Sequence, residues 1–584
     1  MTEGDFSSEQ KRYLEGFTSG LQAMRGAKAA EALVAPPKPM GPDAAHLAAQ
    51  DAVVAAGRKL VDQEKWKRAE HPFDAYARLA AQARAAAFPK PDDNFRWRYF
   101  GLFYVAPTQS SYMLRLRIPN GVLTHAQFAG VADIAERHGG GYAHVTTRAN
   151  LQVREIMPAN AVAVVEAIQD LGLSSRGSGA DNIRNVTGSA TAGVDPQELC
   201  DTRPLARAWH FHVLNDRSLT GLPRKFNVAF DGGGRVATLE ETNDIGFQAA
   251  RIREGSGVAP GVWFRVLIGG VTGHRDLARD AGVICRAEDC TPIADAIVRV
   301  FVESGDRTDR AKARLKYVLD AWGVEKFLSA VEVKLGRPLT RVGTEAVEPR
   351  PPVDRSAHIG AHRQAQAGLN WIGAALPVGR MTADQMRGLA RIARDAGDGD
   401  VRLTVWQNPI LSGVPDAKLD EAKTAIEALG LDWRATALRA GLVACTGATG
   451  CRFAAAHTKE HAAEIAARLD ARLTLDTPLN IHLTGCHHSC AQHHVGDIGL
   501  LAVKIARGDD EPIEGYTIVV GGGFAERARI GRQLWRDVPF ADCPGKVEGL
   551  LRAYLAHRRE PTESFQDFTD RHAGDALKQL AEAS

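Results

Sequence analysis

The sequence predicts an α+β protein that arose by internal duplication. A segment with the order strand, helix, strand occurs twice at a constant offset of 258 residues, which pairs Pro119 with Pro377 and Asn150 with Asn408. A second segment also repeats, because NDIGFQAARI matches GDIGLLAVKI and each is followed by an apolar strand that ends in glycines. A repeat this long excludes a solenoid. We therefore expect two small half-domains and two larger α/β domains, related by a pseudo-twofold axis.

The duplication also gives the expected domain boundaries. Strand, helix and strand of this length suit a ferredoxin-like half-domain, and the proline-rich EAVEPRPPVD suits a linker between the copies. The expected segments are residues 1–94 (N-terminal helical extension), 95–172 (first ferredoxin-like half-domain), 173–340 (first α/β domain), 341–365 (linker), 366–432 (second ferredoxin-like half-domain) and 433–584 (second α/β domain).

The first 94 residues are rich in alanine and have helical periodicity. Ser7 and Gln10 have the spacing of a capping box before KRYLEGFTSGLQAM, and a second helix is expected from Asp43 through AAHLAAQDAVVAAG. APPKPMGP between them suits an irregular linker. This region has no catalytic motif, so we expect it to wrap the core or to shape a docking face.

Segments with the pattern of strands begin near residue 95. FRWRYFGLFYV and SYMLRLRIPNG are expected to form strands, and alternation in the second places Arg115 and Arg117 on one face. A helix over THAQFAGVADIAERHG follows, and then one strand over YAHVTTRANLQVREI, which places Arg148 and Gln152 on a common face. A further helix is expected from Arg310 through RAKARLKYVLDAWG.

Two short cysteine pairs mark the last third of the chain. Cys445 and Cys451 are separated by five residues, and Cys486 and Cys490 by three. Four thiolates on two such loops suit a tetrahedral soft-metal site, either structural zinc or an iron–sulfur cluster. Zinc knuckles usually place two residues between paired cysteines, which favours iron–sulfur. Four histidines beside these cysteines leave a zinc site as an alternative. If zinc is absent, we interpret them as loop residues or proton donors near the site: His487, His488, His493 and His494.

The two copies of the half-domain differ in charge. Basic residues of the first copy align with uncharged residues of the second, whereas the paired cysteines occur only in the second copy. The aligned pairs are Arg115 with Gly373, Arg117 with Ala375, and Arg148 with Trp406. Once duplicated halves pack about a pseudo-twofold axis, one can supply cations and the other the metal around a shared central cavity.

Six basic residues of the first copy form the candidate anion site. They are Arg115, Arg117, Arg148, Arg184, Arg224 and Lys225. For one arginine alone a surface ion pair is the simplest explanation, but as a set that the sister copy lacks they favour a buried anionic ligand. Arginine forks suit carboxylates as bidentate partners, whereas a lysine supplies a compact charge and a proton.

Composition excludes several classes of protein. The chain has 584 residues, of which 45% are hydrophobic, and 72 basic against 70 acidic residues give a net charge of +2. No basic run indicates a nucleic-acid partner, and no leader or long apolar stretch indicates export or a membrane partner. We expect a cytoplasmic protein in which the other four cysteines are reduced and buried, namely Cys200, Cys285, Cys290 and Cys543.

The cysteine pattern also gives a specific resemblance. C-x5-C followed by C-x3-C, with AQHHVGDIGLL after the last cysteine, resembles the siroheme-dependent nitrite and sulfite reductases. The resemblance implies a 4Fe-4S cluster held by Cys445, Cys451, Cys486 and Cys490. It further implies that Cys490 bridges the cluster to the siroheme iron as its axial ligand. Siroheme and a 4Fe-4S cluster are therefore the expected cofactors.

Further motifs extend the resemblance to the cations. Arg115, Arg184 and Lys225 fall where the family binds the substrate anion. The positions that correspond to siroheme contacts are Arg117, Thr146, Thr147, Arg148, Gln152 and Arg224. Sulfite reductases commonly carry a second lysine two residues after the first, but this chain has Asn227, as in ferredoxin-dependent nitrite reductases. Nitrite carries one negative charge and deprotonated sulfite two, so this position favours nitrite.

The function that the resemblance implies is an assimilatory nitrite reductase. It would convert nitrite to ammonia with six electrons from reduced ferredoxin or another small donor, and its catalytic residues would be Arg115, Arg184, Lys225 and Asn227. No flavin or dinucleotide motif occurs, so the donor is expected to be a separate protein. The alternatives are a sulfite reductase, an oxygenase resembling precorrin-3B synthase, and a zinc-stabilised protein without catalytic activity.

Overall fold

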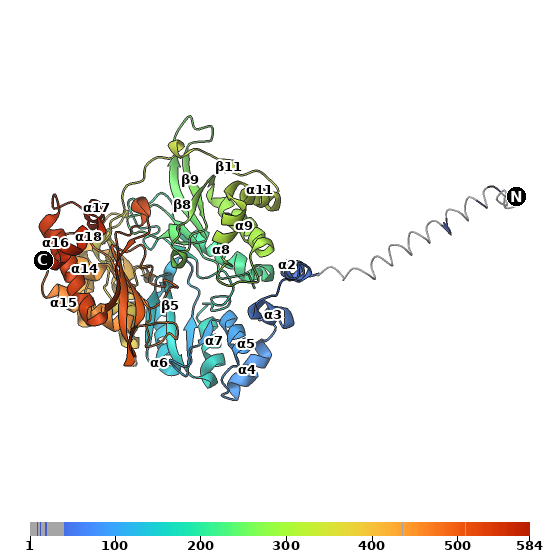
Figure 1. Cartoon of the computed structure of the whole chain (residues 1–584), viewed down its shortest axis with the longest axis horizontal. Helices are drawn as coiled ribbons and strands as arrows, with labels where there is room; N and C mark the ends of the chain where they lie inside the picture. Colours follow the sequence, from blue (N-terminus) through green and yellow to red (C-terminus); the bar gives the residue numbers. More distant parts are fainter. Residues whose placement is uncertain (1–8, 10–11, 13–17, 20–39, 435, 509) are drawn as a thin grey trace.

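The computed structural model describes residues 40–434, 436–508 and 510–584, together with residues 9, 12, 18 and 19. The helix expected from Ser7 therefore lies largely outside the described residues. Four sheets organise the described chain, one in each half-domain and one in each α/β domain. The first α/β domain, in green, and the second, in orange and red, lie on different sides of the molecule in Figure 1.

The two half-domains share one strand order and exchange a strand. Their strands are β1 (Leu102–Tyr104), β2 (Tyr112–Arg115), β3 (Val122–Thr124), β4 (Tyr142–Thr146) and β5 (Asn150–Ile156), then β12 (Gly360–Arg363), β13 (Leu369–Gly373), β14 (Arg380–Thr382), β15 (Asp400–Leu403) and β16 (Pro409–Pro415). The sheet orders are β1-β2-β5-β4-β14 and β12-β13-β16-β15-β3. Each sheet thus takes its last strand from the other copy, as β14 pairs with β4 and β3 with β15. This reciprocal exchange fixes the two copies about a pseudo-twofold axis.

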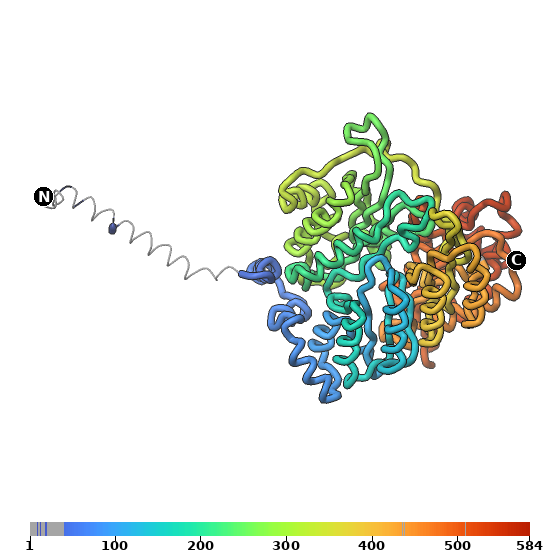
Figure 2. The backbone as a smooth tube through the Cα atoms, turned by 180° about the vertical axis from the view of Figure 1, so that it is seen from behind, coloured from blue at the N-terminus to red at the C-terminus, as the bar shows by residue number. Residues whose placement is uncertain are grey.

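The helices of the half-domains confirm the repeat. α6 (His125–His138) and α12 (Ala383–Ala396) each begin with a capping box, in which Thr124 pairs with Gln127 and Thr382 with Gln385. The two helices pack against each other, and Figure 2 shows the two half-domains side by side from behind. A second helix covers each half-domain, α7 (Ala161–Asp170) in the first and α13 (Leu419–Ala428) in the second.

The two α/β domains also repeat each other. The first has strands β6 (Thr187–Gly188), β7 (Val228–Asp231), β8 (Ile245–Ile252), β9 (Gly261–Ile268), β10 (Arg279–Cys285) and β11 (Thr340–Arg341), with helices α8 (Arg203–Asn215), α9 (Cys290–Ser304), α10 (Leu315–Trp322) and α11 (Val324–Leu335). The second has β17 (Leu442–Ala444), β18 (Ile481–Thr484), β19 (Ile498–Arg507), β20 (Asp510–Val520) and β21 (Arg532–Pro539), with helices α14 (Ala437–Ala440), α15 (Thr458–Asp470), α16 (Cys543–His557), α17 (Phe565–Asp570) and α18 (Gly574–Ala583). In both, three parallel strands are followed by an antiparallel one. The predicted internally duplicated α+β fold is confirmed.

Three element boundaries differ from the prediction. FRWRYFGLFYV is helical at first, because Pro91 and two acidic residues start α5 (Pro91–Trp97), which continues into a 3₁₀ turn before β1. The helix expected from Arg310 begins only at Leu315, since Arg310 extends its side chain to Asp181 from a loop. The expected linker is partly structured, because it includes the end of β11 and all of β12.

The described part of the N-terminal extension is built into the core. It forms α2 (Ala44–Ala55), which confirms the helix expected from Asp43, and then α3 (Asp62–Ala69), α4 (Tyr76–Arg84) and α5. Lys67 of α3 donates hydrogen bonds to the carbonyls of Gly221 (3.1 Å) and Leu222 (2.9 Å), and its ammonium lies 3.7 Å from the carboxylate of Asp181. These contacts support the loop that carries Arg224.

Replacing Lys67 with methionine is expected to lower the free energy of unfolding by about 3 kcal/mol. The substitution removes a cation from the buried carboxylates of Glu64 and Asp181 and leaves two carbonyls without a donor. Chemical denaturation measures this loss. The matched control is Lys65→Met on the same helix, whose pair with Asp62 is exposed; equal losses in both variants would contradict the buried network.

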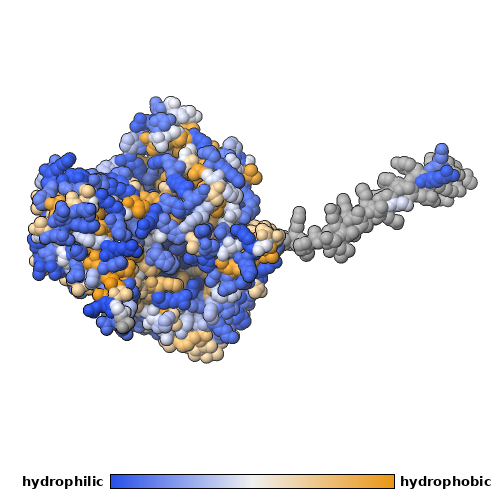
Figure 3. Space-filling model, viewed as in Figure 1, coloured by the Kyte–Doolittle hydropathy of each residue, from blue (hydrophilic) through white to orange (hydrophobic). Residues whose placement is uncertain are grey.

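No helix among the described residues is long and apolar enough to cross a membrane. On the face shown in Figure 3, hydrophilic residues predominate and hydrophobic ones form only scattered patches.

Candidate functional site

The fold brings the four paired cysteines to one edge of a sheet. Cys445 directly follows β17, and Cys486 lies just beyond β18. These strands are parallel neighbours, so their carboxyl ends meet at the same edge. Burial, and after it the negative charges of the other three cysteines, raise the pKa of the Cys486 thiol to about 12. The four thiols are therefore near one another, and their binding of one common cluster stays a prediction.

A single zinc ion does not suit this arrangement. Zinc needs ligands near 2.3 Å that converge on one point. Within the described ranges no three His, Cys, Asp or Glu side chains converge in this way. The neighbouring histidines do not complete such a site either, because His487 is exposed whereas His493 and His494 are buried.

The surroundings of Cys490 combine exposure with desolvation. Its side chain is accessible, yet burial raises the pKa of its thiol. Lys225 shows the same combination, because its side chain is partly exposed although burial lowers its pKa to about 7. Both side chains are thus accessible although the surrounding protein excludes much of the bulk water. The charge of Lys225 opposes the rise in the pKa of Cys490, so the two side chains lie near each other.

A tight turn connects the first copy to the cysteine loop. The single strand expected over YAHVTTRANLQVREI is a hairpin of β4 and β5, because Thr146 and Ala149 close a turn with Ala149 at a φ of 46°. The turn carries Thr147, whose hydroxyl donates to the carbonyl of Cys490 at 2.8 Å. Arg148 follows and donates to the side chain of Asn243 and the carbonyl of Asn185. The hairpin thus puts Thr147 and Arg148 beside the last cysteine.

The candidate cations lie near one another, and Arg115 lies near the cysteines. Burial lowers the pKa of Arg115, and the charges of Cys490 and Cys451 oppose this shift. Burial also lowers the pKa of Arg184 well below its usual value and that of Arg148 to about 9. The positive charge of Arg115 depresses the pKa of both further. Mutually repelling cations next to thiols require an anionic ligand to offset the cost of burying them.

Unpartnered donors show that the site fits such a ligand. The Nε atoms of Arg148 and Arg184 are buried without a hydrogen-bond partner. The other guanidinium nitrogens of Arg184 are held by the carbonyls of Ser178 and Ala180, at 2.8 and 2.7 Å. A macrocycle with several carboxylates, set against Cys490, would meet these charges. The donor set therefore fits siroheme beside a cysteine-bound cluster.

The remaining predicted site residues adjoin this set. Gln152 pairs across the sheet with Arg115, and the Thr146 hydroxyl accepts from the backbone of Arg148. Burial lowers the pKa of Arg224 to about 10, and its guanidinium lies 3.9 Å from Asp181. The backbone N–H of Asn227 donates to Asp244 at 2.8 Å, which leaves its side chain outside that bond. A role for each in binding siroheme or substrate stays a prediction.

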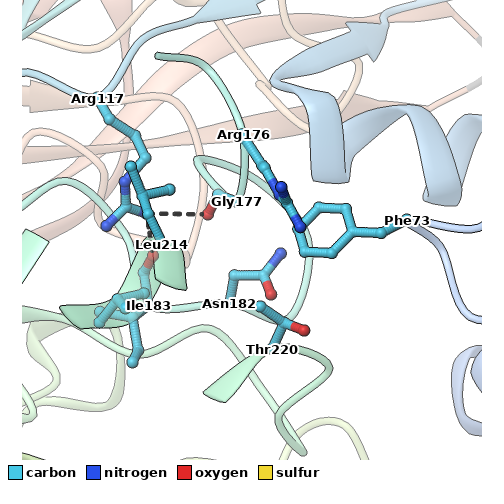
Figure 4. A pocket seen from close by; sticks show the side chains of 9 residues that line it. Phe73, Arg117, Arg176, Gly177, Asn182, Ile183, Leu214 and Thr220 are labelled. Carbon is cyan, nitrogen blue, oxygen red and sulfur yellow. Dashed lines mark hydrogen bonds between the residues drawn. The ribbon is translucent and has the colours of Figure 1, made fainter. Parts of the chain in front are cut away.

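Arg117 has surroundings different from those of Arg115. It is 1% exposed and donates to the carbonyls of Ile183 (2.7 Å) and Gly177 (3.3 Å). Figure 4 shows it at a cavity of about 10 Å³ that Phe73 and Arg176 also line. Arg117 thus braces the loop that leads into Arg184, and its predicted contact with the cofactor remains a prediction.

The structure adds residues that the sequence motifs did not reveal. Arg154 of β5 donates to the carbonyl of Gly450 and to the Thr446 hydroxyl, both between Cys445 and Cys451. Asp181 accepts two hydrogen bonds from Arg310 and so links two loops of the site. Comparison of the copies could have indicated Arg154, because the same offset aligns it with uncharged Ser412.

The pseudo-symmetric position in the second copy is filled by aromatic side chains. Trp406 replaces Arg148 there and is 2% exposed. Its ring lies 5.4 Å from that of His358 and 4.9 Å from that of Phe524, and its indole N–H donates to the carbonyl of Ala237. The cationic site is therefore present only in the first copy, and the equivalent position in the second copy is part of the buried core.

Comparison with known proteins supports this organisation. The "Nitrite/Sulfite reductase ferredoxin-like half domain" matches residues 104–171 and 362–429, and the "Nitrite and sulphite reductase 4Fe-4S domain" matches residues 179–339 and 437–571. The ferredoxin–nitrite reductase of Synechococcus elongatus is 36% identical over 79% of this chain and 89% of its own length. The assimilatory ferredoxin-dependent nitrite reductase of Haloferax mediterranei is 30% identical over 89% of this chain and 93% of its own.

A solved structure agrees with the sequence matches. The NirA protein of Mycobacterium tuberculosis superimposes with a TM-score of 0.82 at 27% identity, covering 90% of this chain and 99% of that protein. The matched half-domains are the two that exchange strands, and the first of them carries Arg115 and Arg148. The matched 4Fe-4S segments carry Arg184, Lys225 and the four paired cysteines. The chain belongs to the family of siroheme- and 4Fe-4S-dependent nitrite and sulfite reductases.

Proposed function

We propose that the protein is an assimilatory nitrite reductase that takes electrons from reduced ferredoxin. Nitrite, six electrons and eight protons would give ammonium and two waters. The relatives with 30 to 36% identity over most of the chain are named as ferredoxin-dependent nitrite reductases. The observation that carries the proposal is the group of desolvated cations, Lys225 and Arg115, near Cys490, because such a group suits a small anion next to a redox centre.

The side chains would bind the anion and deliver protons. Bound siroheme would supply the iron at which N–O bonds break, and the cluster would pass electrons to it singly. Arg115 and Arg184 would stabilise negative charge on the nitrite oxygens. Lys225, whose pKa is lowered by burial to about 7, would donate protons near neutral pH. The Asn227 amide would orient one oxygen without adding charge.

The direct test is turnover of nitrite and sulfite by the purified holoenzyme with reduced ferredoxin. We expect nitrite to be the better substrate by kcat/KM and siroheme to be extractable from the protein. A preference for sulfite would contradict the proposal and support the sulfite reductase alternative. A preparation without siroheme would support the precorrin-3B synthase-like alternative. We also infer a cytoplasmic site of action, because its eight free cysteines include four that must stay reduced to bind a cluster.

Asn227→Lys is expected to raise the ratio of sulfite to nitrite kcat/KM by about tenfold, because a second cation favours the dianion. The substitution keeps the backbone N–H that donates to Asp244, so this hydrogen bond should survive. The equivalent Asn480 donates to Asp497 through its backbone in the same way. Gln169→Lys on the exposed end of α7 adds the same charge far from the motif and is the control. An unchanged ratio would show that Asn227 does not select the substrate.

A further inference from the structure

Two buried cations lie against the loop from Cys445 to Cys451. Lys459 of α15 is 9% exposed, and its ammonium donates to the carbonyls of Val378 and Ala444, the residue just before Cys445. Arg154 of β5 is 3% exposed and donates to the Gly450 carbonyl (3.0 Å) and the Thr446 hydroxyl (2.8 Å). A Cβ at Gly450 would lie only 2.5 Å from Arg154, so the loop rests directly on the guanidinium.

Among the described residues, neither cation has a carboxylate partner. In the part of the chain that the structure describes, no Asp or Glu oxygen lies within 4.0 Å of Lys459 or Arg154. Burial lowers the pKa of Lys459 to about 7, and the charge on Cys445 is the strongest influence in the opposite direction. Burial likewise lowers the pKa of Arg154 to about 10, while the charges of Tyr142, then Cys451 and Cys445, oppose this shift. The thiolates are thus a main source of compensation for these charges.

The first turn of α15 adds to this positive field. The Thr458 hydroxyl donates to the Cys445 carbonyl at 2.8 Å, so the positive end of the helix dipole adjoins the same cysteine. The sister copy lacks a counterpart to Arg154, because the constant offset aligns this residue with Ser412.

We propose that Lys459 and Arg154 are the buried counter-charges of the iron–sulfur cluster and set its reduction potential. A cluster with four thiolate ligands is negative, and it gains one more negative charge on reduction. Nearby cations in a low-dielectric site stabilise the reduced form more than the oxidised form. The cluster's charge in turn keeps Lys459 protonated. This inference rests on the cluster of the proposed enzyme but not on which anion it reduces.

The test is the midpoint potential of the cluster in the Lys459→Met holoenzyme, measured by redox titration with electron paramagnetic resonance. We expect the potential to become more negative by at least a tenfold change in the one-electron equilibrium, which is 59 mV. Arg380→Met is the control, because the charge of Arg380 also reaches Lys459 but its side chain is exposed to water. Its potential should change much less.

An unchanged potential in Lys459→Met, with the cluster retained, would overturn the proposal. If the methionine variant loses iron, Lys459→Arg shows whether the loss comes from removing the charge or from disturbed packing. Retention of the cluster in the arginine variant supports the proposal, whereas equal loss in both variants overturns it. These readouts do not depend on substrate, so a holoenzyme that prefers sulfite would change the proposed function without affecting this result.

Discussion

Cys490→Ser is expected to abolish the six-electron reduction of nitrite, with activity lower by on the order of 10³- to 10⁴-fold. Of the four paired cysteines only Cys490 has an exposed side chain, although burial raises the pKa of its thiol. The charges of Lys225 and Arg115 lower the pKa of this thiol, whereas those of Cys445 and Cys451 raise it. Cys490 is therefore near both the cations and the other thiols, as the predicted bridging ligand would be.

Turnover with reduced ferredoxin measures this loss, and absorption and resonance spectra report whether siroheme and the cluster remain coupled. The matched control is Cys200→Ser, which changes a half-buried cysteine of the first α/β domain outside the motif. The hydrogen bond from Thr147 to the backbone of residue 490 does not need the thiol, so the loop should keep its place. Full activity in Cys490→Ser would rule out the bridge.

The fold and much of the site could be predicted because the two copies can be aligned, and the positions at which they differ indicate the site. The constant offset aligned Thr124 with Thr382, and both cap a helix in the structure. It also aligned Arg148 with Trp406, which lie at equivalent turns, one bonded to Asn185 and Asn243 and the other buried in aromatic core. A residue that is cationic in one copy and apolar in the other reports a site that only one copy keeps.

What the sequence could not reveal depends on contacts between distant segments. Alternation suggested one strand through Thr147 and Arg148, but the turn at Ala149 depends on packing against the cysteine loop 343 positions away from Thr147. Lys67 lies in an extension without any motif, and only the fold places it under the carbonyls of Gly221 and Leu222. Buried polar networks of this kind have no local pattern.

Lys225→Met is expected to lower kcat/KM for nitrite by about 10²- to 10³-fold, because it removes a cation and a proton donor from the candidate site. The same change should stabilise the protein purified without cofactors. Burial lowers the pKa of Lys225 from 10.5 to about 7, so the unfolded chain binds more protons between these values. At pH 7 the methionine variant should therefore exceed the wild type in free energy of unfolding by about 3 kcal/mol.

The sign of the pH dependence shows whether the stability gain of Lys225→Met comes from removing a buried charge or from better packing of the methionine side chain. Wild-type stability should rise from pH 7 toward 10.5, as the folded protein no longer carries a buried charge that the unfolded chain retains. The advantage of Lys225→Met should be full below pH 7 and vanish near pH 10.5, as followed by denaturation at several pH values. Lys578→Met, at a more exposed lysine on α18, should show no such trend. A gap that is constant with pH would mean that Lys225 is not a buried charge held ready for an anionic ligand.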